Sequence, residues 1–200
     1  KLVLFQSEDN IMKRLNSLIS ITLATLITAG TISSSWAGSD KEDLAVAKSI
    51  IDKSGITAQA AIRKVQQEYN GVIYSYDLDD DENDVYFHEI KLIDIEADKK
   101  IKLIISIENG EIVAQEWNRL FSWFFEDDRI VTARKLATMK YTILDAIDAL
   151  KLDDSSLLQE IEVEDKQGVL FFELETIDDD GEKDWLVDAN NNQIIPVFKK

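Results

Sequence analysis

The residues of this sequence that come nearest to a catalytic motif lie at His88-Glu89-Ile90-Lys91-Leu92. The first two match the start of the zinc-protease signature His-Glu-x-x-His, but Leu92 stands where the second histidine is required. A catalytic zinc takes three protein ligands, and His88 is the only histidine in the sequence. The spacing therefore argues against this metal site and predicts an ordinary structural histidine on a strand.

Two acidic segments, 77–84 and 178–184, offer the hard oxygen ligands that calcium prefers. The candidate cation ligands within them are Asp79, Asp81, Asp178 and Asp180. Neither segment has EF-hand spacing, because alignment on Gly181 puts a valine where the bidentate glutamate belongs. The alternative interpretation of each segment is a solvated, charged hairpin tip. Cation binding therefore stays a secondary hypothesis.

Other routes to catalysis have little support in the sequence. It contains no cysteine, which removes thiol nucleophiles and thiolate metal sites. No glycine-rich phosphate loop and no Gly-x-Ser-x-Gly elbow occurs. Among 39 acidic residues, no pair stands out as a general acid and base. We therefore expect no enzymatic activity and no cofactor.

The charge of the chain restricts its partners. It has 22 Lys and Arg against 39 Asp and Glu, a formal net charge of -17 over 200 residues. Such a chain is repelled by nucleic acid and by anionic lipid, and it attracts basic partners. We expect a protein partner and no nucleic acid.

The N-terminal region has the order of a secretory signal peptide. Basic residues follow Met12, an apolar stretch runs to Ile32, and Ser35-Trp36-Ala37 supplies the small-x-small exit. The segment 12–37 is therefore predicted to be cleaved after Ala37, and residues 1–11 are upstream read-through or a cloning remnant. A membrane anchor is the alternative, but serines and threonines interrupt the apolar run. The expected location is periplasmic or secreted, with no stable membrane span after cleavage.

An internal repeat predicts the architecture. The segment Val85–Asp94 returns 84 positions later as Val169–Asp178, with Val, Phe, Glu, Ile and Asp at matching offsets. Apolar residues at helical spacing precede each copy, and alternating apolar residues continue after it. We therefore predict an α+β fold of two repeated units, 38–115 and 129–200. Each unit is expected to pack a helix on a three- to four-stranded antiparallel sheet, with Phe87 and Phe171 or their neighbours facing the helix.

An aromatic segment, 116–128, joins the two units. Trp117, Leu120, Phe121, Phe124 and Phe125 recur at the i, i+3, i+4, i+7, i+8 spacing of a helix. This pattern predicts a connecting helix. Two roles remain open: packing between the units, or an exposed partner-binding ridge formed by Trp117, Phe121, Phe124 and Phe125.

Both copies resemble the PepSY domain. The similarity rests on Ile56-Thr57 before helically spaced alanines, on a Tyr/Phe-x-x-Glu-Ile strand, and on the turn Asn109-Gly110-Glu111-Ile112-Val113. The second copy matches from Tyr141-Thr142 onward, although Asn191-Asn192 replaces Asn-Gly.

This resemblance implies a cystatin-like helix on an antiparallel sheet, in secreted or membrane-attached proteins. Some members of the family belong to propeptides of thermolysin-like metalloproteases. The resemblance therefore implies a non-catalytic binding module that associates with a peptidase and restrains it. The alternative is a cation-binding or envelope-stress protein that uses the acidic hairpins. The sequence leaves the oligomeric state open.

Overall fold

The computed structural model describes residues 40–81, 85–120, 128–153, 155–178 and 180–197. The predicted signal peptide, the residues before it and Phe121, Phe124 and Phe125 lie outside these ranges. Within them, no helix is both long and apolar enough to cross a membrane. The elements are, in chain order, α2 (Asp40–Ser54), α3 (Ala58–Glu68), β1 (Val72–Asp80), β2 (Tyr86–Asp94), β3 (Lys99–Ser106), β4 (Ile112–Arg119), α4 (Asp128–Met139), α5 (Ile143–Leu150), β5 (Leu157–Lys166), β6 (Val169–Asp178), β7 (Gly181–Asp188) and β8 (Ile194–Val197).

The eight strands form one antiparallel sheet in the order β4-β3-β2-β1-β5-β6-β7-β8. The predicted α+β class with an antiparallel sheet is confirmed. The expectation of a separate sheet in each half of the chain is wrong, because β1 pairs with β5 through Ser75–Asp77 and Glu160–Glu162. This pairing forms hydrogen bonds along the edges of β1 and β5, which two separate sheets would leave unpaired.

The two helices that precede the strands begin where the sequence predicts. Thr57 caps α3, and its side-chain oxygen accepts a hydrogen bond from the backbone of Ala60 at 3.2 Å. Thr142 caps α5 in the same way, and Asp145 completes a capping box by accepting from the Thr142 backbone. These caps fix the register of the apolar stripes that face the sheet.

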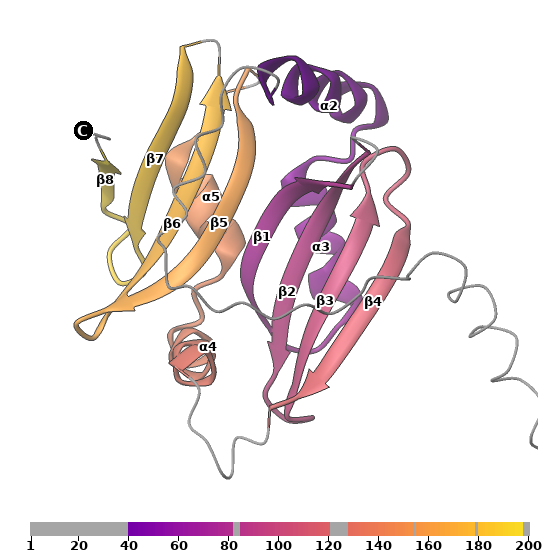
Figure 1. The fold of residues 1–200 in the computed structure, drawn as a ribbon. Helices are drawn as coiled ribbons and strands as arrows, with labels where there is room; N and C mark the ends of the chain where they lie inside the picture. Colours follow the sequence, from indigo (N-terminus) through magenta and orange to yellow (C-terminus); the bar gives the residue numbers. More distant parts are fainter. Residues whose placement is uncertain (1–39, 82–84, 121–127, 154, 179, 198–200) are drawn as a thin grey trace, which may run out of the picture. The chain divides into compact units, whose positions relative to one another are not determined.

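Helices α3 and α5 cover one face of the sheet and contact each other (Figure 1). Strand alternation turns His88 and Ile90 of β2 and Phe172 of β6 toward these helices, where each is fully buried. Phe87 and Phe171 point to the other face and are partly exposed. Their neighbours, rather than these two phenylalanines, therefore form the core beneath the helices.

The predicted connecting helix over 116–128 is wrong for its first five residues, 116–120. Residues 116–119 belong to β4, which pairs with β3 from Lys99↔Arg119 to Ile105↔Ile112. The ladder of hydrogen bonds to β3 stabilises an extended chain here. This tertiary pairing overrides the helical spacing of the aromatic residues. At the far end, α4 begins at Asp128, so the remainder of the predicted segment, 121–127, lies outside the described residues.

Candidate functional site

The sheet face opposite α3 and α5 carries five acidic residues in one line across five neighbouring strands. The cross-strand partners are Glu89↔Asp77, Asp77↔Glu160, Glu160↔Glu175 and Glu175↔Asp184. Directly opposed residues in an antiparallel pair lie on the same face with Cβ atoms about 4.5–5.5 Å apart. We call these five residues the carboxylate row. No described helix crosses this face of the strands in Figure 1.

At the β2 end, the row is neutralised by lysines. The buried Glu89 forms ion pairs with Lys91, at 2.7 Å, and with Lys102. Burial alone would raise the pKa of the Glu89 carboxyl. Hydrogen bonds from Lys102 and Lys91 outweigh that effect and hold the pKa below its ordinary value. Glu89 therefore stays ionised at neutral pH.

Farther along the row, the carboxylates repel one another. Partial burial raises the pKa of the Asp77 carboxyl to about 7, and the charges of Glu160 and Asp79 contribute further. Lys91 opposes this shift only in part. The pKa of the Glu160 carboxyl is also raised, first by partial burial and then by the charges of Glu175 and Glu162. At neutral pH, the Asp77 carboxyl is therefore protonated in part of the molecules and ionised in the rest.

This arrangement can bind cationic groups. Like charges directly opposite on a sheet are destabilising, and a cation placed between them relieves the repulsion. A carboxyl with a pKa near 7 can also act as an acid or base, but catalysis needs a pocket that excludes water. None of the five residues lines the depression beneath α4, described below, or a second depression lined by residues of α2, the start of α3 and the turn before β5. The face offers instead a broad, acidic surface.

The four predicted cation ligands do not form a metal site among the described residues. Asp81 accepts the Val85 backbone N–H at 3.1 Å, and Asp79 is exposed on the open face of β1. Asp178 pairs with Lys183, which also lies 3.6 Å from Asp180. Across the described ranges, no group of three or more His, Cys, Asp or Glu is arranged to hold a metal ion.

His88 lies on the opposite, helix-covered face of the sheet. Its Nε2 lies 2.9 Å from the Ile56 carbonyl oxygen and must donate to it, so its Nδ1 accepts from the Tyr76 hydroxyl at 3.0 Å. Burial lowers the pKa of His88 to about 4, although the Ile56 carbonyl favours the charged form. The neutral ring on β2 therefore links Tyr76 of β1 to Ile56, just before α3. The predicted structural role fits this geometry.

Of the four aromatic residues predicted to bind a partner, only Trp117 lies in the described part of the chain. It stands on β4 with 56% of its surface exposed, and the Lys99 ammonium lies 4.7 Å from its ring centre. A cation over the ring face stabilises this orientation. Trp117 therefore lies at one edge of the sheet rather than on a helical ridge.

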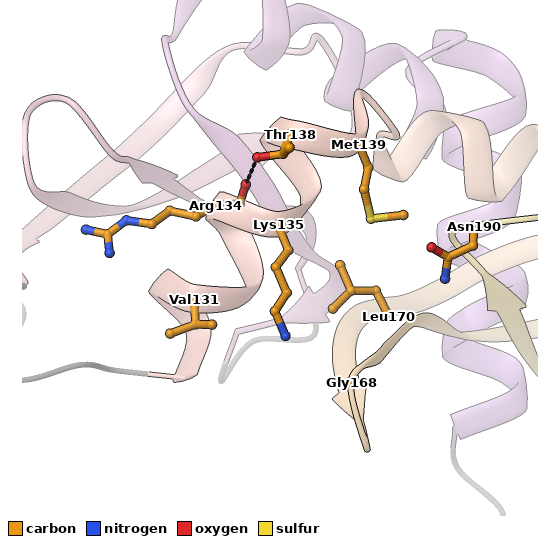
Figure 2. Close-up of a pocket in the computed structure, with 8 residues that line it drawn as sticks. All are labelled: Val131, Arg134, Lys135, Thr138, Met139, Gly168, Leu170 and Asn190. Atoms are coloured by element: carbon orange, nitrogen blue, oxygen red, sulfur yellow. Dashed lines mark hydrogen bonds between the residues drawn. The ribbon is translucent and has the colours of Figure 1, made fainter.

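A depression of about 380 Å³ lies beneath α4 (Figure 2). Its lining comes from α4, from β6 and from the turns after β5 and β7. The lining residues are Val131, Arg134, Lys135, Thr138, Met139, Gly168, Leu170 and Asn190. Two polar groups already have partners, since Thr138 donates to the Arg134 carbonyl and Lys135 pairs with Asp165. Arg134 points away from Met139 and Leu170 in Figure 2, so the depression does not converge on a reactive centre.

The carboxylate row was not foreseen from the sequence. A local signal exists, because acids alternate at Glu160 and Glu162 and again at Glu173 and Glu175. That period of two could have identified an acidic strand face. The alignment with Asp77 depends on the pairing of β1 with β5, which local patterns do not encode.

Comparisons with known proteins add little to this geometry. No family model matches the sequence, and no curated protein does. Among solved structures, the crystal structure of a "putative lipoprotein" from Clostridium difficile 630 is similar, with a TM-score of 0.45 and 18% identity. The similarity covers 72% of this chain and 93% of the other. A likeness this distant carries no argument about function. Its own structure defines the described part of the chain as an α+β protein whose sheet has one helix-covered face and one acidic face that no described helix covers.

Proposed function

We propose that this protein is a non-catalytic binding module that holds a protein partner through a basic segment laid on the open sheet face. The carboxylate row is the observation that carries the proposal. It presents acids on β2, β1, β5, β6 and β7 in register, and the lysine partners of Glu89 lie at its β2 end. An extended or helical segment rich in Lys and Arg is complementary to such a surface.

The sequence supports a more specific form of this proposal. The order helix, helix, four strands occurs twice in the described chain, which is consistent with two PepSY-like units. The predicted signal peptide favours action in the periplasm or outside the cell. The partner that the resemblance implies is a peptidase, whose activity the module would restrain. A basic patch on the peptidase would then contact the carboxylate row.

Binding can be tested with the mature chain, 38–200, and two charge-matched double variants. Glu160→Gln with Glu175→Gln removes two charges from the centre of the row. Glu96→Gln with Glu108→Gln removes two exposed charges from turns outside it. The probe is a lysine-rich peptide, followed by envelope extract. The proposal predicts salt-sensitive binding to wild type that weakens at least tenfold in the row variant only. Equal binding by both double variants would exclude the row as the contact surface.

Restraint of a peptidase is measured separately. A thermolysin-type metalloprotease and envelope peptidases are assayed on a protein substrate with and without the mature chain. Inhibition that the row variant loses supports the peptidase partner, whereas peptide binding without inhibition leaves only the general binding function. Cation binding at the hairpin tips, the alternative function, rests on their acidic composition alone. A calcium titration followed by thermal melting tests it, and no shift at millimolar calcium would remove it.

A further inference from the structure

The two edges of the sheet differ in their capacity to pair with another strand. At one edge, β8 has only four residues and contains Pro196, which has no backbone N–H to donate. At the other edge, β4 has eight residues and no proline, and seven of the eight are exposed. No described strand pairs with its outer side. Long, regular edges of this kind readily add a further strand.

The outward-pointing backbone groups of β4 can be identified. Leu120, just after the strand, donates its backbone N–H to the Asp98 carbonyl at 3.0 Å and so points toward the β3 side. Hydrogen-bonding direction alternates along an antiparallel strand. Asn118 and Glu116 therefore also point toward β3. The N–H and C=O groups of Trp117 and of its neighbours two residues away point outward.

We propose that β4 pairs with β4 of a second copy of this chain, antiparallel and centred on Trp117. In this register Trp117 lies opposite Trp117 of the second copy. Gln115 then lies opposite Arg119, and Glu116 lies opposite Asn118. No like charges face each other, and the central pair is aromatic, which is among the favourable cross-strand pairs.

Neighbouring registers are less favourable. Centring the pair on Glu116 would place that carboxylate opposite its own copy, which is destabilising. Centring it on Gln115 would run the pairing through Val113. There the register between β4 and β3 shifts, between Ile104 and Ile105, and distorts the edge. The register centred on Trp117 uses only the regular part of the strand, from Ala114 to Arg119.

The net charge of the chain permits this contact because the acids of the row lie mainly on distant strands. The strands next to the edge carry Lys99, Lys100 and Lys102 beside Arg119, so the edge itself is not acidic. Beyond the lysine-paired Glu89 of β2, the next acids of the row lie on β1, three strands away from β4, or about 14 Å at the usual strand spacing. That distance exceeds the screening length of about 8 Å in physiological salt. The contact is also separate from the carboxylate row and does not depend on the proposed function.

A single-cysteine experiment tests the register directly, because the chain has no cysteine of its own. Directly opposed residues in a hydrogen-bonded antiparallel pair have Cα atoms about 5.5 Å apart, within the range that a disulfide spans. We expect Trp117→Cys to form a disulfide-linked dimer under mild oxidation. The matched control is Ile195→Cys, at an exposed apolar position of the β8 edge, which should stay a monomeric thiol. Equal crosslinking of the two variants would overturn the proposal.

Sedimentation equilibrium over a concentration series gives the second measurement. The paired strands bury much less than the roughly 1,600 Å² of a standard interface, so dimerisation should be weak and concentration-dependent. Trp117→Lys places a cation opposite its own copy and should weaken association at least tenfold, whereas Ile195→Lys should not change it. A wild-type chain that stays monomeric throughout, or a dimer that survives Trp117→Lys, refutes the pairing. Circular dichroism melts establish that each variant is folded, and the cysteine pair decides the question if Trp117→Lys is not.

Discussion

Replacing Asp77 with Asn should stabilise the protein, and the gain should depend on pH. In the folded chain the pKa of this carboxyl is raised from 3.8 to about 7, mainly by burial and then by the charge of Glu160. A shift of about 3 units corresponds to about 4 kcal/mol at 1.36 kcal/mol per unit. Asp77 is partly exposed and its neighbours titrate with it, so we expect about half of this, about 2 kcal/mol.

The sign follows from proton linkage. Between pH 3.8 and about 7 the folded chain binds more protons at Asp77 than the unfolded chain does, so this residue lowers stability as the pH rises. Asparagine has no proton to lose. The advantage of Asp77→Asn should therefore be close to zero below pH 4 and complete above pH 7.

Urea unfolding between pH 4 and pH 8.5 measures the effect, because urea is uncharged and does not screen the carboxylates. A gain of about 2 kcal/mol corresponds to a rise of roughly 4–8 °C in melting temperature for a domain of this size. The matched control is Asp79→Asn, which removes the same charge from an exposed position of the same strand. An Asp77→Asn gain that is equal at pH 4 and pH 8.5, or a loss at high pH, would refute the account of the carboxylate row.

Four further outcomes follow from the geometry. The single imidazole of His88, followed by NMR, should show no titration between pH 5 and pH 8, because its pKa is lowered to about 4; a midpoint near 6.5 would contradict its buried, neutral bridge. Because the pKa of His88 falls from 6.5 in the unfolded chain to about 4 in the folded chain, burial of the neutral ring contributes about 3 kcal/mol to the free energy of unfolding. This contribution is present above pH 6.5 and is lost as the pH falls toward 4. Glu89→Gln should destabilise the fold by about 3 kcal/mol in urea unfolding, because it leaves two neighbouring lysines without their shared carboxylate; an unchanged midpoint would mean that the lysines find other partners. Gly71→Ala should cost more than about 2 kcal/mol in a thermal melt, because Gly71 has φ +146° and a Cβ there would lie 2.7 Å from the Ile93 carbonyl oxygen; a cost below 1 kcal/mol would show that the turn can shift.

Elements whose signal is local were predictable from the sequence. Thr57 and Thr142 marked the first turns of α3 and α5, because a side-chain oxygen must replace the missing helical acceptor there. Alternating apolar residues marked the strands, because successive side chains on a strand point to opposite faces. The missing second histidine after His88 was enough to argue against a zinc-protease site, and the acidic composition was enough to make nucleic acid a poor partner.

Features that depend on contacts between distant residues required the tertiary structure. Trp117 fits a helical stripe in the sequence, but hydrogen bonds to β3 hold it in an edge strand. Asp77 and Glu160 are 83 positions apart, and only the pairing of β1 with β5 puts their carboxylates side by side. The sequence alone was enough to predict helices and strands whose signal depends on neighbours a few residues away, but not β4, where pairing with β3 overrides a helical pattern. The tertiary structure decided the joined sheet, its open edge and its carboxylate row, because strand pairing brings together residues that no local pattern relates.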